Sequence, residues 1–152
     1  MKLDSRLSSV LHVLLHMASK DAPVPSEVLS RHLGTNPVVV RRTMGGLRDA
    51  GLVRSGRGKG GGWTLSRPLS EITLKDVYVA LGEPPLFAFG NRNETPDCLV
   101  EQAVNARVDD AMRDAEARLL ERFSTITLAD LDADFRERLA RHPGRTHDHA
   151  PS

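Results

Sequence analysis

The segment "RSGRGKGGGWTL", residues 54–65, constrains the fold more than any other part of the chain. Gly56, Gly58 and Gly61 match the G-x-G-x-x-G pattern of dinucleotide-binding loops. Such a loop needs a helix directly after the glycines, because the pyrophosphate binds at that helix's N-terminus. Here residues 63–67 alternate in polarity and are closed by Pro68, which predicts a strand. The segment therefore predicts a β-hairpin with a glycine-rich tip, and it argues against a nucleotide-dependent enzyme.

Three helices are expected before this hairpin, and the first two have clear boundary signals. Apolar residues with helical spacing predict a first helix that begins near Asp4 and continues to residue 18. Prolines at positions 23 and 25 interrupt it. Ser26 is expected to cap a short second helix, and Gly34 to end it.

The third helix has a strong start signal. Asn36 is a good N-cap and Pro37 suits the first helical position, while Gly51 ends the segment. The helical period places Val40, Thr43, Met44 and Leu47 inward, and Val38, Arg41, Arg42 and Gly45 outward. The pair Gly45-Gly46 disfavours a helix by about 1 kcal/mol per residue. Either this helix is short, or something approaches its backbone closely.

Cationic residues concentrate in the third helix and the hairpin. Residues 35–67 carry seven Lys or Arg and one carboxylate, whereas residues 91–140 carry twelve carboxylates and seven arginines. This segregation favours a surface for a polyanion, although a solvated cationic face would have the same composition. Helix, short helix, tight turn, helix and cationic hairpin is the order of a winged helix-turn-helix, whose third helix enters the DNA major groove.

The second half of the chain is expected to be helical. Thr73 and Asp76 form a capping-box pattern for a fourth helix, and the following residues to position 95 are irregular. A long helix is expected from Pro96 to about Phe123, followed by an amphipathic helix that begins at Thr127. One narrow apolar stripe runs along the long helix: Val100, Val104, Val108, Met112, Ala115 and Leu119. Pairing with a second copy of the chain would cover it, and packing onto the chain's own domain is the alternative.

Composition and histidine positions restrict the remaining possibilities. No apolar run approaches the roughly 18 residues of a membrane span. A single cysteine cannot form an intramolecular disulfide, and no secretion signal is recognisable, which favours the cytoplasm. His12 and His16 have a spacing that can chelate a metal on a helix, but no third ligand is evident, so a polar surface is the preferred interpretation and no metal site is predicted.

The stretch "LRDAGLVRSGRGKGGGWTLSRPLSEITLKDVYVALGEP" resembles the wing and following helix of the Rrf-two family of bacterial transcription regulators. The resemblance covers nearly all of residues 1–140, and it implies a homodimer, joined through the long helix, that binds a palindromic operator on double-stranded DNA. It also implies that Trp63 anchors the base of the wing. The positions expected to contact DNA are Asn36, Val38, Val39, Arg41, Arg42, Arg57, Lys59 and Gly60.

One departure from that family concerns its cofactor. Cluster-binding relatives carry three cysteines near the start of the long helix, whereas this chain has only Cys98 there. No iron–sulfur cluster or other cofactor is therefore expected. If Thr95 caps the long helix and Pro96 begins it, Cys98 lies in the first turn, where the helix dipole favours a thiolate. A thiol redox switch and an inert cysteine both remain open.

The chain is thus expected to be mainly α-helical with a small β-hairpin. Residues 1–82 would form a winged helix-turn-helix DNA-binding domain and residues 83–95 a connector. Residues 96–140 would hold the dimerisation helix and the C-terminal helix, and residues 141–152 a disordered tail. The predicted function is sequence-specific transcription regulation, as a repressor, without enzymatic activity. The alternative is a winged helix that binds an acidic protein partner.

Overall fold

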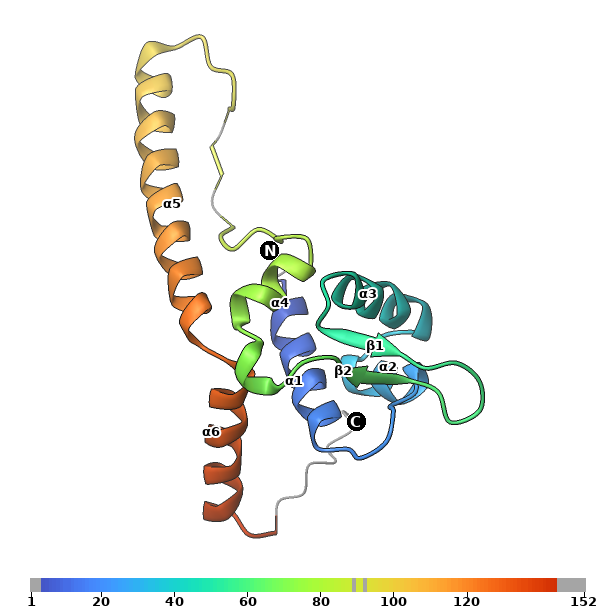
Figure 1. Ribbon diagram of the computed structural model, residues 1–152. Coiled ribbons are helices and arrows are strands. Elements are labelled where there is room, and N and C mark those ends of the chain that lie inside the picture. Colours follow the sequence, from blue (N-terminus) through green and yellow to red (C-terminus); the bar gives the residue numbers. More distant parts are fainter. Residues whose placement is uncertain (1–3, 89, 92, 145–152) are drawn as a thin grey trace.

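The computed structural model describes residues 4–88, 90–91 and 93–144, and its order of elements is mainly helical with one β-hairpin (Figure 1). Three helices precede the hairpin, and three helices follow it. The elements are α1 (Arg6–Ala18), α2 (Ser26–Leu33), α3 (Pro37–Asp49), β1 (Val53–Ser55), β2 (Trp63–Leu65), the short 3-10 turn η1 (Leu69–Glu71), α4 (Leu74–Ala80), α5 (Leu99–Thr125) and α6 (Leu128–Arg141). The expected fold class is confirmed.

A single apolar core joins α1, α2, α3, the hairpin, α4 and the start of α6. Its fully buried side chains include Leu14, Leu29, Met44 and Val77, together with Leu128 from α6. The inward and outward faces expected for α3 are largely observed, since Val40, Met44 and Leu47 are buried. Thr43 is half-buried.

Local signals set both ends of the turn between α2 and α3. Gly34 adopts φ 61°, a left-handed conformation that suits glycine at a helix C-terminus. Asn36 caps α3 by accepting hydrogen bonds from the N–H groups of Val38 and Val39, each at 3.0 Å. The expectation for Ser26 was wrong, because Pro25 holds the cap position of α2 and Ser26 is the first helical residue. The Ser26 hydroxyl instead accepts a hydrogen bond from Trp63.

The glycine pair in α3 does not shorten the helix, which continues to Asp49. A Cβ atom on Gly46 would lie 2.9 Å from the carbonyl oxygen of Ala80 at the end of α4. Close approach of another segment is therefore the correct alternative for Gly46. Gly45 has no such constraint, since a Cβ there would meet only the Arg48 side chain at 3.9 Å.

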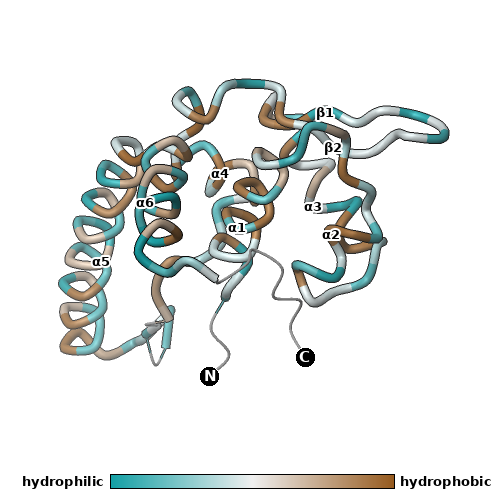
Figure 2. The backbone as a smooth tube through the Cα atoms, turned by 90° about the horizontal axis from the view of Figure 1, so that it is seen from below, coloured by the Kyte–Doolittle hydropathy of each residue, from teal (hydrophilic) through white to brown (hydrophobic). Residues whose placement is uncertain are grey.

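The hairpin is antiparallel, and β1 pairs with β2 from Val53↔Leu65 to Ser55↔Trp63. On its other edge, Trp63 exchanges two backbone hydrogen bonds with Val24 at 3.0 and 2.9 Å. The hairpin is thereby attached to the segment that leads into α2. Its tip extends away from the helices, on the opposite side of the molecule from α5 (Figures 1 and 2).

Capping boxes begin α4 and α6, formed by Thr73 with Asp76 and by Thr127 with Asp130. The start of α5 differs from the expectation. Cys98 holds its cap position and Leu99 is the first helical residue, three positions after Pro96. The first helical bond runs from the Gln102 N–H to the Cys98 carbonyl, whereas the Pro96 carbonyl accepts from the Gln102 side chain.

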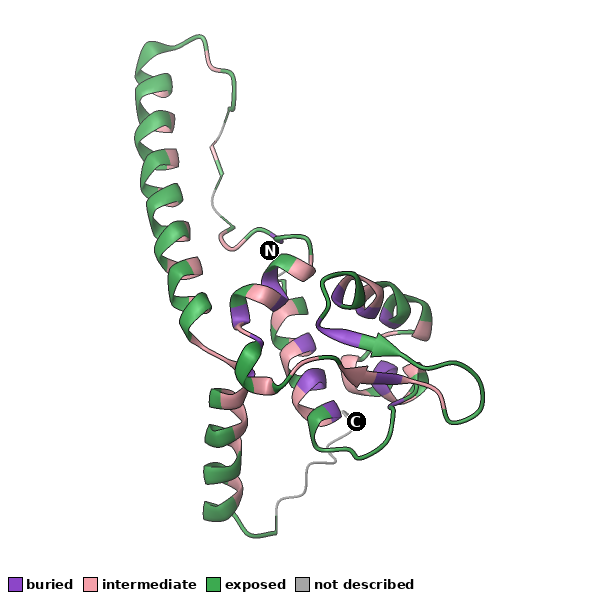
Figure 3. Cartoon of the chain, viewed as in Figure 1, coloured by how far each residue is buried: buried purple, intermediate pink, exposed green. Residues whose placement is uncertain are grey.

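Helix α5 lies along one side of the molecule, and none of its residues is buried (Figure 3). Its later turns contact α4, where the rings of Tyr78 and Phe123 are 6.4 Å apart. The expected apolar stripe divides into two parts. Met112 and Leu119 are half-buried, whereas Val100, Val104 and Val108 are 72, 55 and 42% exposed, and Ala115 is also exposed.

The disordered tail expected for residues 141–152 begins too early, because Arg141 belongs to α6. Residues 145–152 lie outside the described part of the chain. Among the described residues, no helix is both long enough and apolar enough to cross a bilayer.

Candidate nucleic-acid interface

The N-terminal turns of α3 expose apolar and cationic side chains side by side. Val38 and Val39 are 63 and 39% exposed, although valine is among the residues most often buried. Arg41 and Arg42 follow them and are also exposed. The ion pairs among the described residues involve neither arginine, and the Arg41 Nε donates only to the Pro37 carbonyl, at 3.4 Å. Both guanidinium groups are thus available to an anionic partner.

The wing is a loop whose glycines hold its shape. Gly56 and Gly62 close its base through a hydrogen bond of 2.8 Å from the Gly56 N–H to the Gly62 carbonyl. At the tip, Gly58 and Gly60 have φ values of 76° and 83°, in the left-handed region that side chains with a Cβ rarely adopt. Lys59 lies between these two glycines, Arg57 directly precedes Gly58, and both cations are exposed. The tip therefore presents two cations on a backbone with few side chains around it.

Trp63 connects this wing to α2. The indole is 7% exposed, and its Nε1–H donates to the Ser26 hydroxyl at 3.0 Å. Gly62 must be a glycine at this junction, because a Cβ atom would lie 2.7 Å from the Val24 backbone. The base of the wing is thus held by side-chain and main-chain contacts to the entry of α2.

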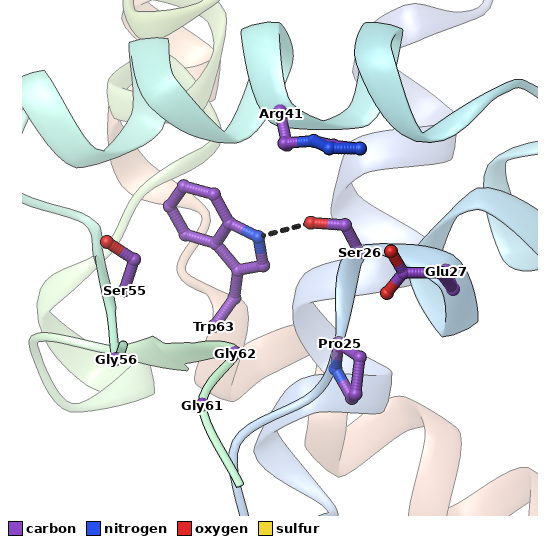
Figure 4. A pocket seen from close by; sticks show the side chains of 9 residues that line it. All are labelled: Pro25, Ser26, Glu27, Arg41, Ser55, Gly56, Gly61, Gly62 and Trp63. Carbon is purple, nitrogen blue, oxygen red and sulfur yellow. Dashed lines mark hydrogen bonds between the residues drawn. The ribbon is translucent and has the colours of Figure 1, made fainter. Parts of the chain in front are cut away.

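An open hollow of about 270 Å³ lies between the wing, α2 and α3 (Figure 4). The indole of Trp63 and the side chain of Arg41 lie at its two sides, and Ser26 and Glu27 come from the first turn of α2. The structure thus places a cation of α3 beside the base of the wing. Arg42, Lys59 and the tip residues do not line this hollow.

Sequence reasoning did not assign Pro25, Ser26 or Glu27 to this region. Ser26 and Trp63 are 37 positions apart, so no local pattern indicates that they meet. The indole N–H was the usable signal, since a buried tryptophan normally finds an acceptor.

We refer to the surface formed by Val38, Val39, Arg41, Arg42, Arg57 and Lys59 as the α3–wing face. Two other cations nearby are partly engaged. Arg48 pairs with Asp49 at 3.3 Å, and the Arg54 Nε donates to the Thr64 hydroxyl at 3.1 Å. The arginines and the lysine of the α3–wing face form none of the ion pairs seen among the described residues, so they are free to neutralise phosphates.

Cys98 lies away from this face, at the start of α5, and it is exposed. The backbone N–H groups of Glu101 and Val100 lower the pKa of its thiol, as expected near a helix N-terminus. Protein iron–sulfur clusters are held by about four thiolate or imidazole ligands. The chain has one cysteine, and among its described residues no group of three His, Cys, Asp or Glu side chains could hold a metal ion. The residues present do not fit such a cluster.

The fold and the α3–wing face together define a winged helix-turn-helix protein of the DNA-binding type. The family model for Rrf2, described as an iron-dependent transcriptional regulator, matches residues 3–134. The chain belongs to the Rrf2 family, the family named Rrf-two above. It is a DNA-binding transcription regulator and not an enzyme.

Individual relatives agree with this assignment. YwnA of Bacillus subtilis (strain 168), named among HTH-type transcriptional regulators, is 29% identical over 130 residues, covering 85% of this chain and 96% of YwnA. The regulator IscR of Photorhabdus laumondii is 36% identical over 77 residues, 51% of this chain and 46% of that protein. The chain therefore matches about half of IscR's length. A crystal structure of a Lactobacillus plantarum transcriptional regulator shares the fold, with a TM-score of 0.73 at 24% identity, covering 91% of this chain and 95% of that one.

Proposed function

We propose that the protein is a repressor that binds a palindromic operator as a homodimer, with one α3 in the major groove of each half-site. The observation that carries the proposal is the pairing of exposed valines and unpaired arginines in the first turns of α3. Direct reading of bases by a helix-turn-helix uses these N-terminal turns. We expect this binding to occur in the cytoplasm, where bacterial operators are accessible.

The side chains of α3 suit two kinds of base contact. Arginine can donate two hydrogen bonds to guanine, which discriminates against other bases by about 1–3 kcal/mol. Valine has no hydrogen-bonding group, but its methyl groups can contact the methyl group of thymine. We therefore assign base reading to Val38, Val39, Arg41 and Arg42. Asn36 positions this turn as its cap, from which it can also reach the DNA backbone.

The wing suits phosphate contacts. Arg57 and Lys59 extend from a tip whose glycines let the backbone approach the duplex, and a Cβ atom at Gly60 would meet nothing within 4 Å. We assign these three residues to sequence-independent binding beside the half-site. Each phosphate neutralised contributes about 0.9 to the slope of log affinity against log salt.

The homodimer rests on α5. Val100, Val104 and Val108 form an exposed row with helical spacing, and Leu99 beside them is 78% exposed. Apolar patches of this kind on a soluble surface mark interaction sites. A second copy presents the same row, and a two-fold axis would bury both rows together.

Selection of duplexes from a random library by the full-length protein tests the operator proposal. The expected result is an inverted repeat whose half-sites are centred about one helical turn apart. A selected motif without inverted symmetry would contradict dimeric binding. Absence of any enriched motif would instead favour the protein-binding alternative, which footprinting would also separate by showing no base-specific protection.

Sedimentation of the full chain tests the dimer. Val104→Glu places a charge in the exposed row and is expected to shift the protein toward monomer. Ala106→Glu is the matched control, because Ala106 is also exposed but lies on the opposite side of α5. Equal dissociation of both variants, or no dissociation of Val104→Glu, would rule out this interface.

We further propose that oxidation of Cys98 releases the operator. The thiolate, favoured by the lowered pKa, would attack one oxygen of hydrogen peroxide and break the O–O bond. This forms a sulfenic acid and releases hydroxide, which the solvent protonates to water. Peroxide is expected to release the wild-type protein from its selected operator and to leave Cys98→Ser bound. Equal release of both would assign Cys98 to an inert role.

A further inference from the structure

One carboxylate lies within the surface that we assign to DNA. Glu27 is exposed, belongs to the first turn of α2, and lines the hollow between the wing, α2 and α3. Glu27 and Arg41 are the two charged residues among those that line this hollow. In Figure 4 the Arg41 side chain extends from α3 toward the side of the hollow where Ser26 and Glu27 lie. The hollow therefore combines an anion with a cation that we assign to base reading.

A carboxylate is unexpected in a surface for a polyanion. Glu27 takes part in none of the ion pairs among the described residues, so no cation of the protein neutralises it. An unpaired anion near a duplex repels the phosphates, and it does so whatever the base sequence. Glu27 should therefore oppose binding of any duplex whose backbone comes close to the hollow.

We propose that Glu27 is a specificity-determining residue of the operator site, which positions Arg41 on its base and opposes binding to other sequences. This role rests on the proposed reading of bases by α3. Arginine has five N–H donors, and the Arg41 Nε is directed at the Pro37 carbonyl. The donors on the two terminal nitrogens are enough for two hydrogen bonds to guanine and a further contact with the Glu27 carboxylate.

On the operator, the carboxylate would hold the guanidinium in the orientation that guanine requires. Guanidinium and carboxylate groups are both planar, and their paired hydrogen bonds fix the orientation of each. In the free protein such an exposed pair contributes little, because water screens it. A bound duplex covers the hollow and excludes water, which strengthens the attraction at the moment when Arg41 meets the base.

On a duplex without the matching guanine, the same carboxylate has the opposite effect. Arg41 then turns to a phosphate, the contact that every sequence offers. Glu27 is left unpaired beside the DNA backbone, and its repulsion of the phosphates is not offset. Glu27 thus lowers the affinity for other sequences more than the affinity for the operator.

A role in folding alone is the alternative. Glu27 lies in the first turn of α2, where an anion interacts favourably with the helix dipole. If that were its only role, replacing it would lower the free energy of unfolding without changing the relative affinity for two duplexes. Urea unfolding and DNA binding of the same variants separate the two roles.

Dissociation constants of the full-length protein for its selected operator and for a scrambled duplex, across a salt series, test the proposal. Glu27→Gln is expected to tighten binding to the scrambled duplex severalfold and to weaken binding to the operator. The ratio of the two dissociation constants should fall about tenfold, which is within the range of one arginine–guanine discrimination. The salt slope for the scrambled duplex should steepen by up to about 0.9 per protomer, because one more cation is left to neutralise a phosphate.

Two further substitutions of carboxylates serve as controls. Glu27→Asp keeps the charge and should keep the weak binding to the scrambled duplex. Glu71→Gln removes the same charge from an exposed residue of η1, an element that packs on α6. It should leave both dissociation constants and the salt slope close to those of the wild type.

The Arg41→Ala background tests whether Glu27 acts through Arg41. In that background Glu27→Gln should still tighten binding to the scrambled duplex, but it should not lower the ratio further. A fall in the ratio by the same factor in both backgrounds would overturn the positioning of Arg41 by Glu27.

The proposed function is tested separately from the role of Glu27. A wild-type protein without preference for any selected duplex would refute operator reading itself. A wild-type preference that Glu27→Gln leaves intact, with an unchanged salt slope, would overturn only the role of Glu27. Equal weakening of both duplexes by Glu27→Gln, together with a lower free energy of unfolding, would assign Glu27 to folding alone.

Discussion

The two adjacent glycines of α3 offer a test in which the same substitution has opposite effects. Gly45→Ala removes backbone freedom from a helix interior and is expected to stabilise the protein by about 1 kcal/mol. Gly46→Ala gains the same amount, but its new Cβ lies 2.9 Å from the Ala80 carbonyl oxygen. That is about half an ångström inside ordinary van der Waals contact. Neither atom can rotate away, because the Ala80 oxygen belongs to the backbone and the position of a Cβ is fixed by its own backbone.

Overpacking of this kind costs about 1–3 kcal/mol. Since both variants share the gain in helix propensity, Gly46→Ala is expected to be less stable than Gly45→Ala by that amount. Urea unfolding followed by circular dichroism, at equal protein concentration, gives the difference. In thermal unfolding each kcal/mol corresponds to roughly 2–4 °C for a chain of this size. Equal stabilisation by both substitutions would refute the close approach of α3 and α4.

Three further perturbations test other contacts. Ser26→Ala leaves the buried indole N–H of Trp63 without its acceptor and should lower the free energy of unfolding by about 1–3 kcal/mol, measured in urea, whereas Ser26→Thr keeps the hydroxyl and should lose less. Asn36→Ala removes the cap of α3 and should lower the free energy of unfolding by about 1 kcal/mol, whereas Asn36→Asp should be close to wild type. An unchanged urea midpoint for the alanine variant would contradict the cap. Burial lowers the pKa of His12, so around that pKa the native state binds fewer protons than the unfolded chain. The free energy of unfolding should therefore carry no penalty from His12 above pH 6.5 and should decline as the pH falls below it. His12→Gln should make that decline shallower in unfolding curves recorded across this range, and an identical pH profile would remove His12 as its source.

Signals that act within a few residues were sufficient for much of the fold. Asn36 with Pro37, Thr73 with Asp76, and the strand after the glycines each predicted an element that the structure contains. These patterns work because a cap or an alternation in polarity acts within its own segment. The class of the protein followed from the order of those elements.

Contacts between distant segments could not be predicted in this way. Ser26 looks like a helix cap, but its hydroxyl is used by Trp63, and Pro25 takes the cap position. The role of Gly46 depends on Ala80, which lies in another helix. The ring of His32 lies against those of His12 and His16 only because α2 packs on α1, and no local pattern indicates this contact.

The start of α5 shows a limit of a different kind. Thr95 and Pro96 are good signals for a helix start, yet the helix begins at Leu99. The segment before it is held by side chains of α5, as when the Asn105 amide donates to the Asn93 carbonyl at 2.7 Å. Such contacts outweigh a local preference worth about 1 kcal/mol.

The most direct test of the central claim is the ratio of dissociation constants for the selected operator and a scrambled duplex, at one fixed salt concentration. For the wild-type protein we expect the operator to bind about 10³-fold or more tightly than the scrambled duplex. Replacing Arg41 and Arg42 by alanine should reduce that ratio toward one, while Lys59→Ala should weaken both duplexes by a similar factor and leave the ratio unchanged. An undiminished ratio in the double arginine variant would show that α3 does not read the operator and would contradict the account.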